Sequence, residues 1–126
     1  MIRIIAIGKA GKYESLIKEY EKRLRDIEVL EYKETAKEEQ IEKAVKGRRI
    51  VLDVEGELMT SEDIAEMIKE EVTFIIGGAE GLSTRMKRGK KISFGRITLP
   101  HQLARLVLTE QIYRGKEIQK GTKYHK

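Results

Sequence analysis

The chain has 126 residues, of which 40% are hydrophobic and 37% are charged, and its formal net charge is +5. This length predicts a single domain over residues 1–126, and the lack of cysteine excludes disulfides, thiolate catalysis and cysteine-bound zinc. With two histidines, no long apolar run and no signal peptide, we expect a cytoplasmic protein with neither a membrane span nor a metal site.

The first part of the chain alternates strand and helix patterns. Ile2–Ile7 is an almost continuous apolar run and predicts a buried strand. Ile27–Tyr32 predicts a second strand, and the charged segment Thr35–Lys46 predicts a largely solvated helix. Between the two strands, an amphipathic helix is indicated by an apolar stripe at Tyr13, Leu16, Ile17, Tyr20 and Leu24.

The central part continues this alternation. Arg49–Val54 predicts a third strand, followed by a turn at Glu55-Gly56. Thr60 or Ser61 is suited to cap a helix, whose inward side chains would be Ile64, Met67 and Ile68. Val72–Ile76 predicts a fourth strand that is apolar on both faces, and it runs into a glycine-rich turn, Gly77–Ser83.

The last part predicts a strand at Ser93–Thr98 and a helix from about Pro100 to Ile118, with Pro100 at the first helical position. The whole pattern indicates an α/β fold with a mostly parallel sheet flanked by helices. Ligands of such sheets bind at the carboxyl ends of the strands. We therefore expect a pocket where the glycine turn, the third strand and Phe94–Leu99 end together. A tight turn without a ligand is the alternative, since GGAEG matches no nucleotide-binding fingerprint.

The final helix has an apolar arc too wide for one sheet face to cover, which predicts a homodimer; the alternative is a helix buried within its own domain. Its polar stripe is limited to Gln102, Arg105, Thr109 and Lys116. Inside the apolar arc, Glu110 and Arg114 are spaced for an ion pair. They form either a structural pair or part of a site, in which Arg114 would hold a phosphate or a base.

Both histidines belong to this C-terminal region. His101 begins the final helix, where it would cap the helix, bind substrate, move a proton or have no chemical role. His125 would act only if the tail docks.

Charge is unevenly distributed along the chain. Residues 1–80 hold 14 Lys and Arg against 19 Asp and Glu, whereas residues 81–126 hold 12 against 2. A cationic C-terminal half favours a phosphate-rich partner such as nucleic acid, although lysine-rich proteins also carry such charge for solubility alone.

Three segments resemble the bacterial large-subunit rRNA methyltransferase H family, which belongs to the SPOUT class of S-adenosylmethionine-dependent enzymes. They are FIIGGAEGLS (Phe74–Ser83), ITLPHQLARLVLTEQIYRGKEI (Ile97–Ile118) and the terminal YHK. In outline the resemblance extends to VLDVEG (Val51–Gly56) and to Tyr20-Glu21-Lys22-Arg23. The chain departs from the family pattern in a shorter middle, in Gly115 and Lys116, and in Lys123 before Tyr124.

The resemblance implies a dimeric enzyme with a C-terminal trefoil knot that methylates N3 of a pseudouridine in 23S rRNA of assembled ribosomes. It also implies a pocket for S-adenosyl-L-methionine formed by Leu52, Gly77, Phe94, Gly95, Arg96, Ile97, Thr98 and Leu99. Candidates for taking the N3 proton are His101, Glu110, Tyr124 and His125, with Arg114 stabilising negative charge. Two other hypotheses are a non-catalytic RNA- or ribosome-binding module and an unrelated small nucleotide-binding protein.

Overall fold

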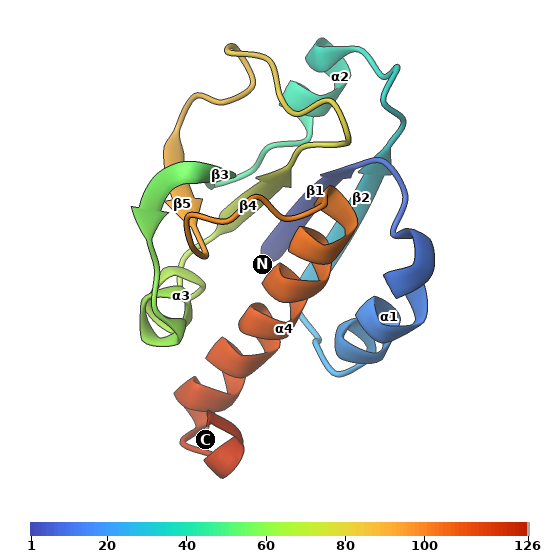
Figure 1. The fold of residues 1–126 in the computed structure, drawn as a ribbon. Helices are drawn as coiled ribbons and strands as arrows, with labels where there is room; N and C mark the ends of the chain where they lie inside the picture. Colours follow the sequence, from blue (N-terminus) through green and yellow to red (C-terminus); the bar gives the residue numbers. More distant parts are fainter. Residues whose placement is uncertain (126) are drawn as a thin grey trace.

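The computed structural model of the chain describes residues 1–125, the side chain of His125 excepted, and contains a five-stranded sheet (Figure 1). From edge to edge the strands are β2 (Ile27–Tyr32), β1 (Ile2–Ile7), β4 (Val72–Ile76), β3 (Arg48–Leu58) and β5 (Lys90–Ser93). Each strand pairs with its neighbours in parallel. The predicted α/β class is therefore confirmed, while the knot stays a prediction.

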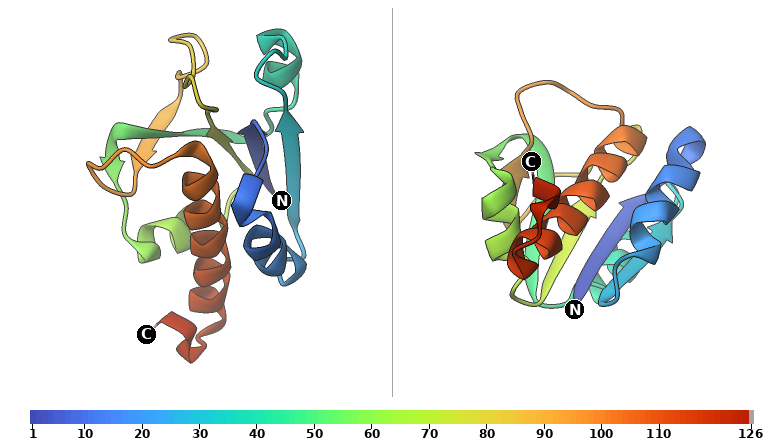
Figure 2. Two further views of the ribbon diagram at one scale, coloured as in Figure 1. Left: turned by 45° about the vertical axis from the view of Figure 1, so that its right-hand side comes forward. Right: turned by 90° about the horizontal axis from the view of Figure 1, so that it is seen from below.

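Helices cover both faces of this sheet (Figure 2). One face packs against α1 (Glu14–Lys22), α3 (Ser61–Met67) and α4 (His101–Lys120), and the other against α2 (Glu38–Lys43) and the link between β4 and β5. Two short 3-10 turns, η1 (Gly11–Tyr13) and η2 (Lys123–His125), precede α1 and follow α4.

Alternate residues of the central strand β4 enter two separate cores. Phe74 lies in the core that includes Ile64 of α3 and Leu108 of α4, whereas Ile75 lies in the core that includes Ile41 of α2 and Met86. All five residues of β4 are buried, as expected for a central parallel strand. Among the described residues, no helix is long and apolar enough to cross a membrane.

The predicted strands β1, β2 and β4 are confirmed with their limits, and the helix of the segment 35–46 is shorter than predicted. The prediction of a strand at Ser93–Thr98 is wrong, because β5 ends at Ser93 and the backbone turns at Gly95 with φ of +145°. The predicted turn at Glu55-Gly56 is wrong too. Gly56 lies inside β3, where a Cβ would stand 2.6 Å from the backbone nitrogen of Ile92.

The long helix α4 packs with its polar stripe facing inward. Arg105 is buried and bonds Glu31 of β2 at 2.5 Å, Thr109 is buried, and Lys116 bonds Asp26 at 2.9 Å. The two cations of the polar stripe are thus paired with acids of β2 and of the segment just before it. Pro100 is the N-cap of α4 and not its first helical residue.

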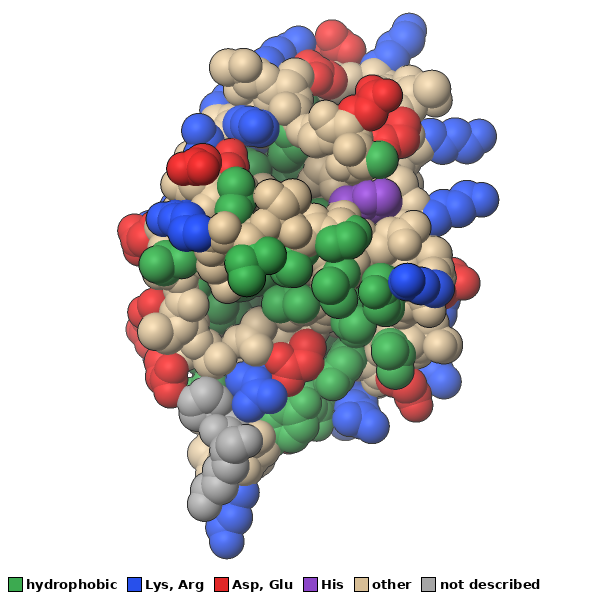
Figure 3. Space-filling model, in the orientation of Figure 1, with side chains coloured by type: hydrophobic (Ala, Val, Ile, Leu, Met, Phe, Trp, Pro, Cys, Tyr) green, Lys and Arg blue, Asp and Glu red, His purple; other side chains and the backbone are tan. Residues whose placement is uncertain are grey.

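The outward side of α4 carries apolar side chains that remain half-exposed, namely Leu103, Leu106 and Val107. Figure 3 shows hydrophobic side chains gathered across the middle of this face, over α4 and the segment that leads into it. Ile97 in that segment is 76% exposed. The outward part of the wide apolar arc predicted for this helix therefore forms a partly exposed hydrophobic surface.

Replacing Gly115 should destabilise the crossing of α3 and α4. A Cβ on Gly115 would lie 2.9 Å from Ile68 Cδ1 and 3.1 Å from Ala65 Cα, which belongs to the backbone. We expect Gly115→Val to lower the free energy of unfolding in urea by about 1–3 kcal/mol through overpacking. Lys120→Val, at an exposed position of the same helix, is the control; equal stability of the two variants would contradict this packing.

Candidate functional site

A cleft of about 820 Å³ lies at the carboxyl ends of β4 and β5 and beside the middle of β3, where β3 continues past its last pairing with β4. Its floor comes from the middle of β3 and the end of β4, and its walls come from the glycine turn after β4, the segment after β5 and the start of α4. The residues that line it are Leu52, Asp53, Val54, Ile76, Gly77, Gly78, Ala79, Gly81, Leu82, Lys87, Ile92, Ser93, Phe94, Gly95, Ile97, Thr98, Leu99, Pro100, His101 and Ala104.

The structure brings most of the sequence-predicted pocket residues together here. The cleft is lined by Leu52, Gly77, Phe94, Gly95, Ile97, Thr98 and Leu99, and by the candidate His101. Arg96 is the exception, because its guanidinium donates to the backbone carbonyl oxygens of Val54 and, at 2.7 Å, of Gly56. Arg96 therefore ties the 94–99 segment to β3 instead of lining the cleft.

Asp53 and Lys87, two charged residues of the cleft, were not predicted from the sequence. Asp53 accepts the backbone N–H of Glu55 at 2.9 Å through one oxygen, and its other oxygen lies 3.9 Å from Lys87 Nζ. The side chain of Asp53 is 13% exposed. Its position directly after the apolar run of β3 was the available signal, since that position places a side chain at the carboxyl edge of the sheet.

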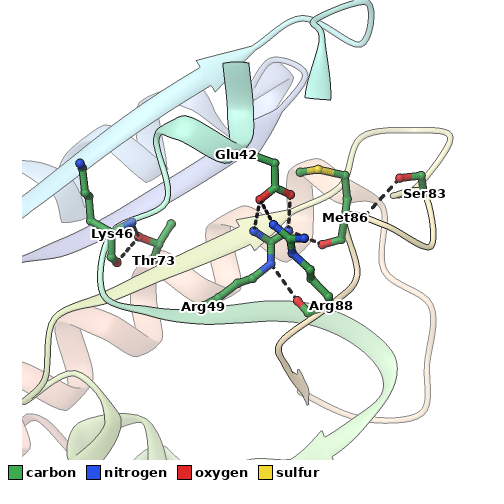
Figure 4. A network of polar contacts seen from close by, with 7 residues as sticks. All are labelled: Glu42, Lys46, Arg49, Thr73, Ser83, Met86 and Arg88. Atoms are coloured by element: carbon green, nitrogen blue, oxygen red, sulfur yellow. Dashed lines mark hydrogen bonds and ion pairs between the residues drawn. The ribbon is translucent and has the colours of Figure 1, made fainter. Parts of the chain in front are cut away.

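The link between β4 and β5 is held by a clamp centred on Arg49 of β3 (Figure 4). Nη1 and Nη2 of Arg49 each donate to an oxygen of Glu42 on α2, both at 2.9 Å. Arg49 also donates to the carbonyl oxygens of Met86 at 2.6 Å and Arg88 at 2.8 Å, and Arg88 bonds Glu42 at 2.7 Å. Paired, nearly buried charges of this kind form strong and directional bonds.

The position of Arg49 also requires a glycine at residue 89 of the link. Gly89 has φ of +100°, and a Cβ there would lie 3.0 Å from Arg49 Cδ and 3.1 Å from the carbonyl oxygen of Arg49. At the start of the same link, the Ser83 hydroxyl donates to Glu38 at 2.6 Å and accepts the N–H of Met86 at 3.2 Å. The link is thus bonded to α2 and β3 at several points, and its first residues form one wall of the cleft.

The glycine turn after β4 has a carboxylate against it. Glu34, which follows β2, accepts the backbone N–H of Ala79 at 2.9 Å, and a Cβ on Gly78 would lie 2.1 Å from Glu34 Oε2. A donor that a phosphate would use is therefore already bonded to a negative group. The turn differs in this respect from glycine loops that cradle phosphates.

His101 stands at the margin of the cleft, against the end of β1. A Cβ on Gly8 would lie 3.1 Å from Nε2 of His101, so the imidazole packs directly over this glycine. A Cβ on Gly11 would likewise lie 2.4 Å from Nε2 of Gln102, the next residue of α4. These two glycines let the first turn of α4 approach the backbone after β1.

Glu110, Arg114 and Tyr124 form a second cluster near the end of α4. Arg114 Nη2 donates to Glu110 Oε2 at 2.8 Å, and the Tyr124 hydroxyl donates to the same oxygen at 3.1 Å. The guanidinium lies 5.0 Å from the centre of the Tyr124 ring, a cation–π contact. Tyr124 also packs edge-on against Tyr113, with the ring centres 4.9 Å apart.

The environment of this cluster shifts two pKa values upward. Burial raises the pKa of Tyr124, and a hydrogen bond to Tyr20 and the charge of Glu110 raise it further. The hydrogen bond to Glu110 raises the pKa of Arg114. Tyr124 therefore stays protonated near neutral pH, where it acts as a hydrogen-bond donor and not as a base.

The two groups of candidate residues are not brought together within one chain. Arg114 lies thirteen positions after His101 on α4, which is about 20 Å along the helix axis. Neither Glu110, Arg114 nor Tyr124 lines the cleft. The side chain of His125 lies outside the described residues. Within the described part of the chain, no group of three or more His, Cys, Asp or Glu could hold a metal ion.

Breaking the Arg49 clamp should loosen the wall of the cleft. Arg49→Gln removes the fork to Glu42 and at least one of the carbonyl bonds, and bonds to charged groups contribute about 1.5–3 kcal/mol each. We expect amide hydrogen exchange of residues 83–89 to accelerate at least about tenfold, which corresponds to about 1.4 kcal/mol.

The neighbouring arginine supplies the control for this experiment. Arg48 is exposed and meets Glu70 only at 3.5 Å, so Arg48→Gln should leave exchange in the segment unchanged. Equal exchange in the two variants would show that Arg49 does not hold the link.

Comparison with known proteins agrees with this geometry. A family model described as "Predicted SPOUT methyltransferase" matches residues 1–125. The chain is 41% identical to "Ribosomal RNA large subunit methyltransferase H" of Oenococcus oeni, over 99% of this chain and 98% of that protein. The proteins of the same name from Coprothermobacter proteolyticus and Caldicellulosiruptor saccharolyticus are 39% and 37% identical, over at least 99% of both chains. The chain belongs to the SPOUT methyltransferase family.

Proposed function

We propose that the chain is an S-adenosylmethionine-dependent methyltransferase that acts on N3 of a pseudouridine in 23S rRNA. The names of the relatives support the rRNA of the large subunit as the substrate. The observation that carries the proposal is the composition of the cleft, which suits a methyl donor of this kind better than it suits a nucleotide.

Phosphate is poorly matched to this cleft. Lys87 is the one lysine or arginine among the described lining residues, and it is shared with Asp53. The glycine turn meets the carboxylate of Glu34. A mononucleotide would therefore bring its negative charge towards two carboxylates, which is unfavourable at short range. This argues against the unrelated nucleotide-binding hypothesis.

S-adenosylmethionine fits the same features. Its adenosine has no phosphate, its sulfonium is cationic, and its flat base suits apolar walls such as those of Leu52, Leu82, Phe94 and Leu99. Asp53 would accept hydrogen bonds from the amino or hydroxyl groups of this ligand. Backbone groups of Gly77 and of the 94–99 segment would hold its polar edges.

The reaction asks mainly for alignment. When bound, S-adenosylmethionine supplies an electrophilic methyl group on sulfur. The N3 nitrogen of the pseudouridine would take this methyl group, and the electron pair of the bond from carbon to sulfur would remain on sulfur. The N3 proton passes to a base, and His101 is the titratable side chain that stands at the margin of the cleft beside the α4 start.

Arg114 would act on the cleft of a second copy. Along α4 it lies too far from His101 to serve the same cleft. If two chains packed through the half-exposed apolar side of α4, the end of α4 of each copy would lie near the cleft of the other. In such a homodimer Arg114 would stabilise negative charge on the base that loses its proton. Glu110 and Tyr124 would hold the guanidinium in place, and the tail would close over the substrate.

The direct test is transfer of a labelled methyl group to ribosomes that lack the modification, with and without the pseudouridine. We expect incorporation at one nucleotide, and only when the pseudouridine is present. Incorporation that does not need the pseudouridine would contradict the substrate assignment. Ribosome binding without any methyl transfer or any heat of S-adenosylmethionine binding would instead identify a non-catalytic module.

Substitution of Arg114 separates its role from cofactor binding. Arg114→Ala should leave the affinity for S-adenosylmethionine within about twofold and lower the transfer rate at least about a hundredfold, the size of effect seen when one stabilising donor is removed. Lys120→Ala, six residues further along α4 and exposed, is the control. Full activity of Arg114→Ala would return Arg114 to a structural role.

A further inference from the structure

We propose that three lysines at the carboxyl ends of β1 and β2 form the surface that receives the RNA backbone beside the cleft. They are Lys9, Lys12 and Lys33, called here the lysine edge. This inference rests on the proposed function, because it assigns a surface to the substrate of the same site.

The sheet order places the lysine edge next to the cleft. The cleft lies over the carboxyl ends of β4 and β5 and the middle of β3, and the carboxyl ends of β1 and β2 continue the edge of the sheet that β4 begins. Lys9 follows β1 by two residues and Lys33 follows β2 directly. The backbone N–H of Gly8 donates to the carbonyl oxygen of Tyr32 at 2.7 Å, so the two exits lie side by side.

The C-terminal cations that first indicated a polyanionic partner are mostly neutralised within the fold. Arg85, Arg88, Lys90, Arg105 and Lys116 each pair with an acid from the first 80 residues. Arg114 and Lys120 pair with acids of their own helix. The uneven charge of the sequence therefore does not become a basic C-terminal face.

The cations of the lysine edge, in contrast, are not neutralised by ion pairs. Its three lysines are exposed and make no ion pair within the described part of the chain; Lys12 meets only the ring of Tyr13, at 5.5 Å. Residues 8–13 contain no acid. Figure 3 shows lysine and arginine side chains projecting along the edge of the molecule beside the histidine.

The acids near β2 are all engaged elsewhere. Glu31 pairs with Arg105, and Glu39 pairs with Arg85. Glu34 accepts the N–H of Ala79, and Glu38 accepts the hydroxyl of Ser83. Glu34 keeps its negative charge, because a backbone N–H does not neutralise a carboxylate, and its Oε2 lies 3.9 Å from the Cβ position of Gly8. Three lysines without an ion pair among the described residues, against this one neighbouring carboxylate, leave the lysine edge with a net positive charge. Exposed lysines without partners bind phosphates and release counterions from nucleic acid.

His101 stands at the boundary between the two parts of this edge. It lines the cleft and packs on Gly8, the residue before Lys9. A strand whose phosphates rest on the lysine edge would present one nucleotide across His101 into the cleft. Phosphate contacts fix register and orientation without reading sequence, which is the role that we assign to these lysines.

The experiment compares two triple variants of the full-length protein. One is Lys9→Ala/Lys12→Ala/Lys33→Ala, and the other is Arg25→Ala/Lys43→Ala/Lys46→Ala, which removes the same charge from exposed positions near the amino ends of β2 and β3. Binding to large ribosomal subunits is measured from low to high salt, together with KM for subunits, kcat and S-adenosylmethionine affinity.

We expect the lysine-edge variant to raise KM for subunits at least about tenfold and to reduce the slope of log affinity against log salt by about one per lysine. kcat at saturation and S-adenosylmethionine affinity should be unchanged. Equal behaviour of the two variants, or a loss confined to kcat, would overturn the inference. If the wild-type protein methylates no ribosomal RNA, the proposed function fails, and the inference fails with it.

Discussion

The cleft depends on hydrogen bonds that tie the backbone on both of its sides to β3. Arg49, on the strand, bonds the carbonyl groups of the link between β4 and β5, and Arg96, on the segment after β5, bonds the carbonyl groups of the strand. Bonds to backbone carbonyls place few demands on the neighbouring side chains, so these remain free to line the cleft. A nearly buried guanidinium requires a counter-charge, and Glu42 of α2 supplies it. The position of α2 and the shape of the cleft are therefore linked.

The fold was most predictable where burial on both faces determines the residues. β1 and β4 are apolar runs with the predicted limits, because parallel strands covered on both faces need apolar side chains on both sides. β2 also has its predicted limits, although it is a partly buried edge strand with two glutamates. The Ser93–Thr98 strand failed because the apolar residues Phe94, Ile97 and Leu99 do not reveal that the backbone turns at Gly95. Gly56 was misread for the opposite reason. It marks the close approach of β5 to β3, which only the folded backbone reveals.

The cleft was predictable in outline, because the carboxyl ends of neighbouring strands meet. Its clamps were not, since Arg49 and Arg96 act on main-chain atoms about 40 residues away that no side-chain pattern identifies. The charge argument failed in a similar way. Arg105 and Lys116 stand in a basic half of the sequence, yet their bonds to Glu31 and Asp26 hold α4 against the N-terminal half. Net charge by segment describes a binding surface only after such pairs are removed.

These pairs also explain the orientation of α4. Because its polar stripe is bonded to acids beside β2, its apolar Leu103, Leu106 and Val107 must face outward. An outward apolar side is unfavourable in water unless another surface covers it. The helix carries His101 at the cleft and Arg114 about 20 Å away, a separation that one cleft cannot bridge. The proposed dimer would account for both facts, because two copies joined along this side would bury the apolar residues and would bring the far end of each helix towards the other cleft.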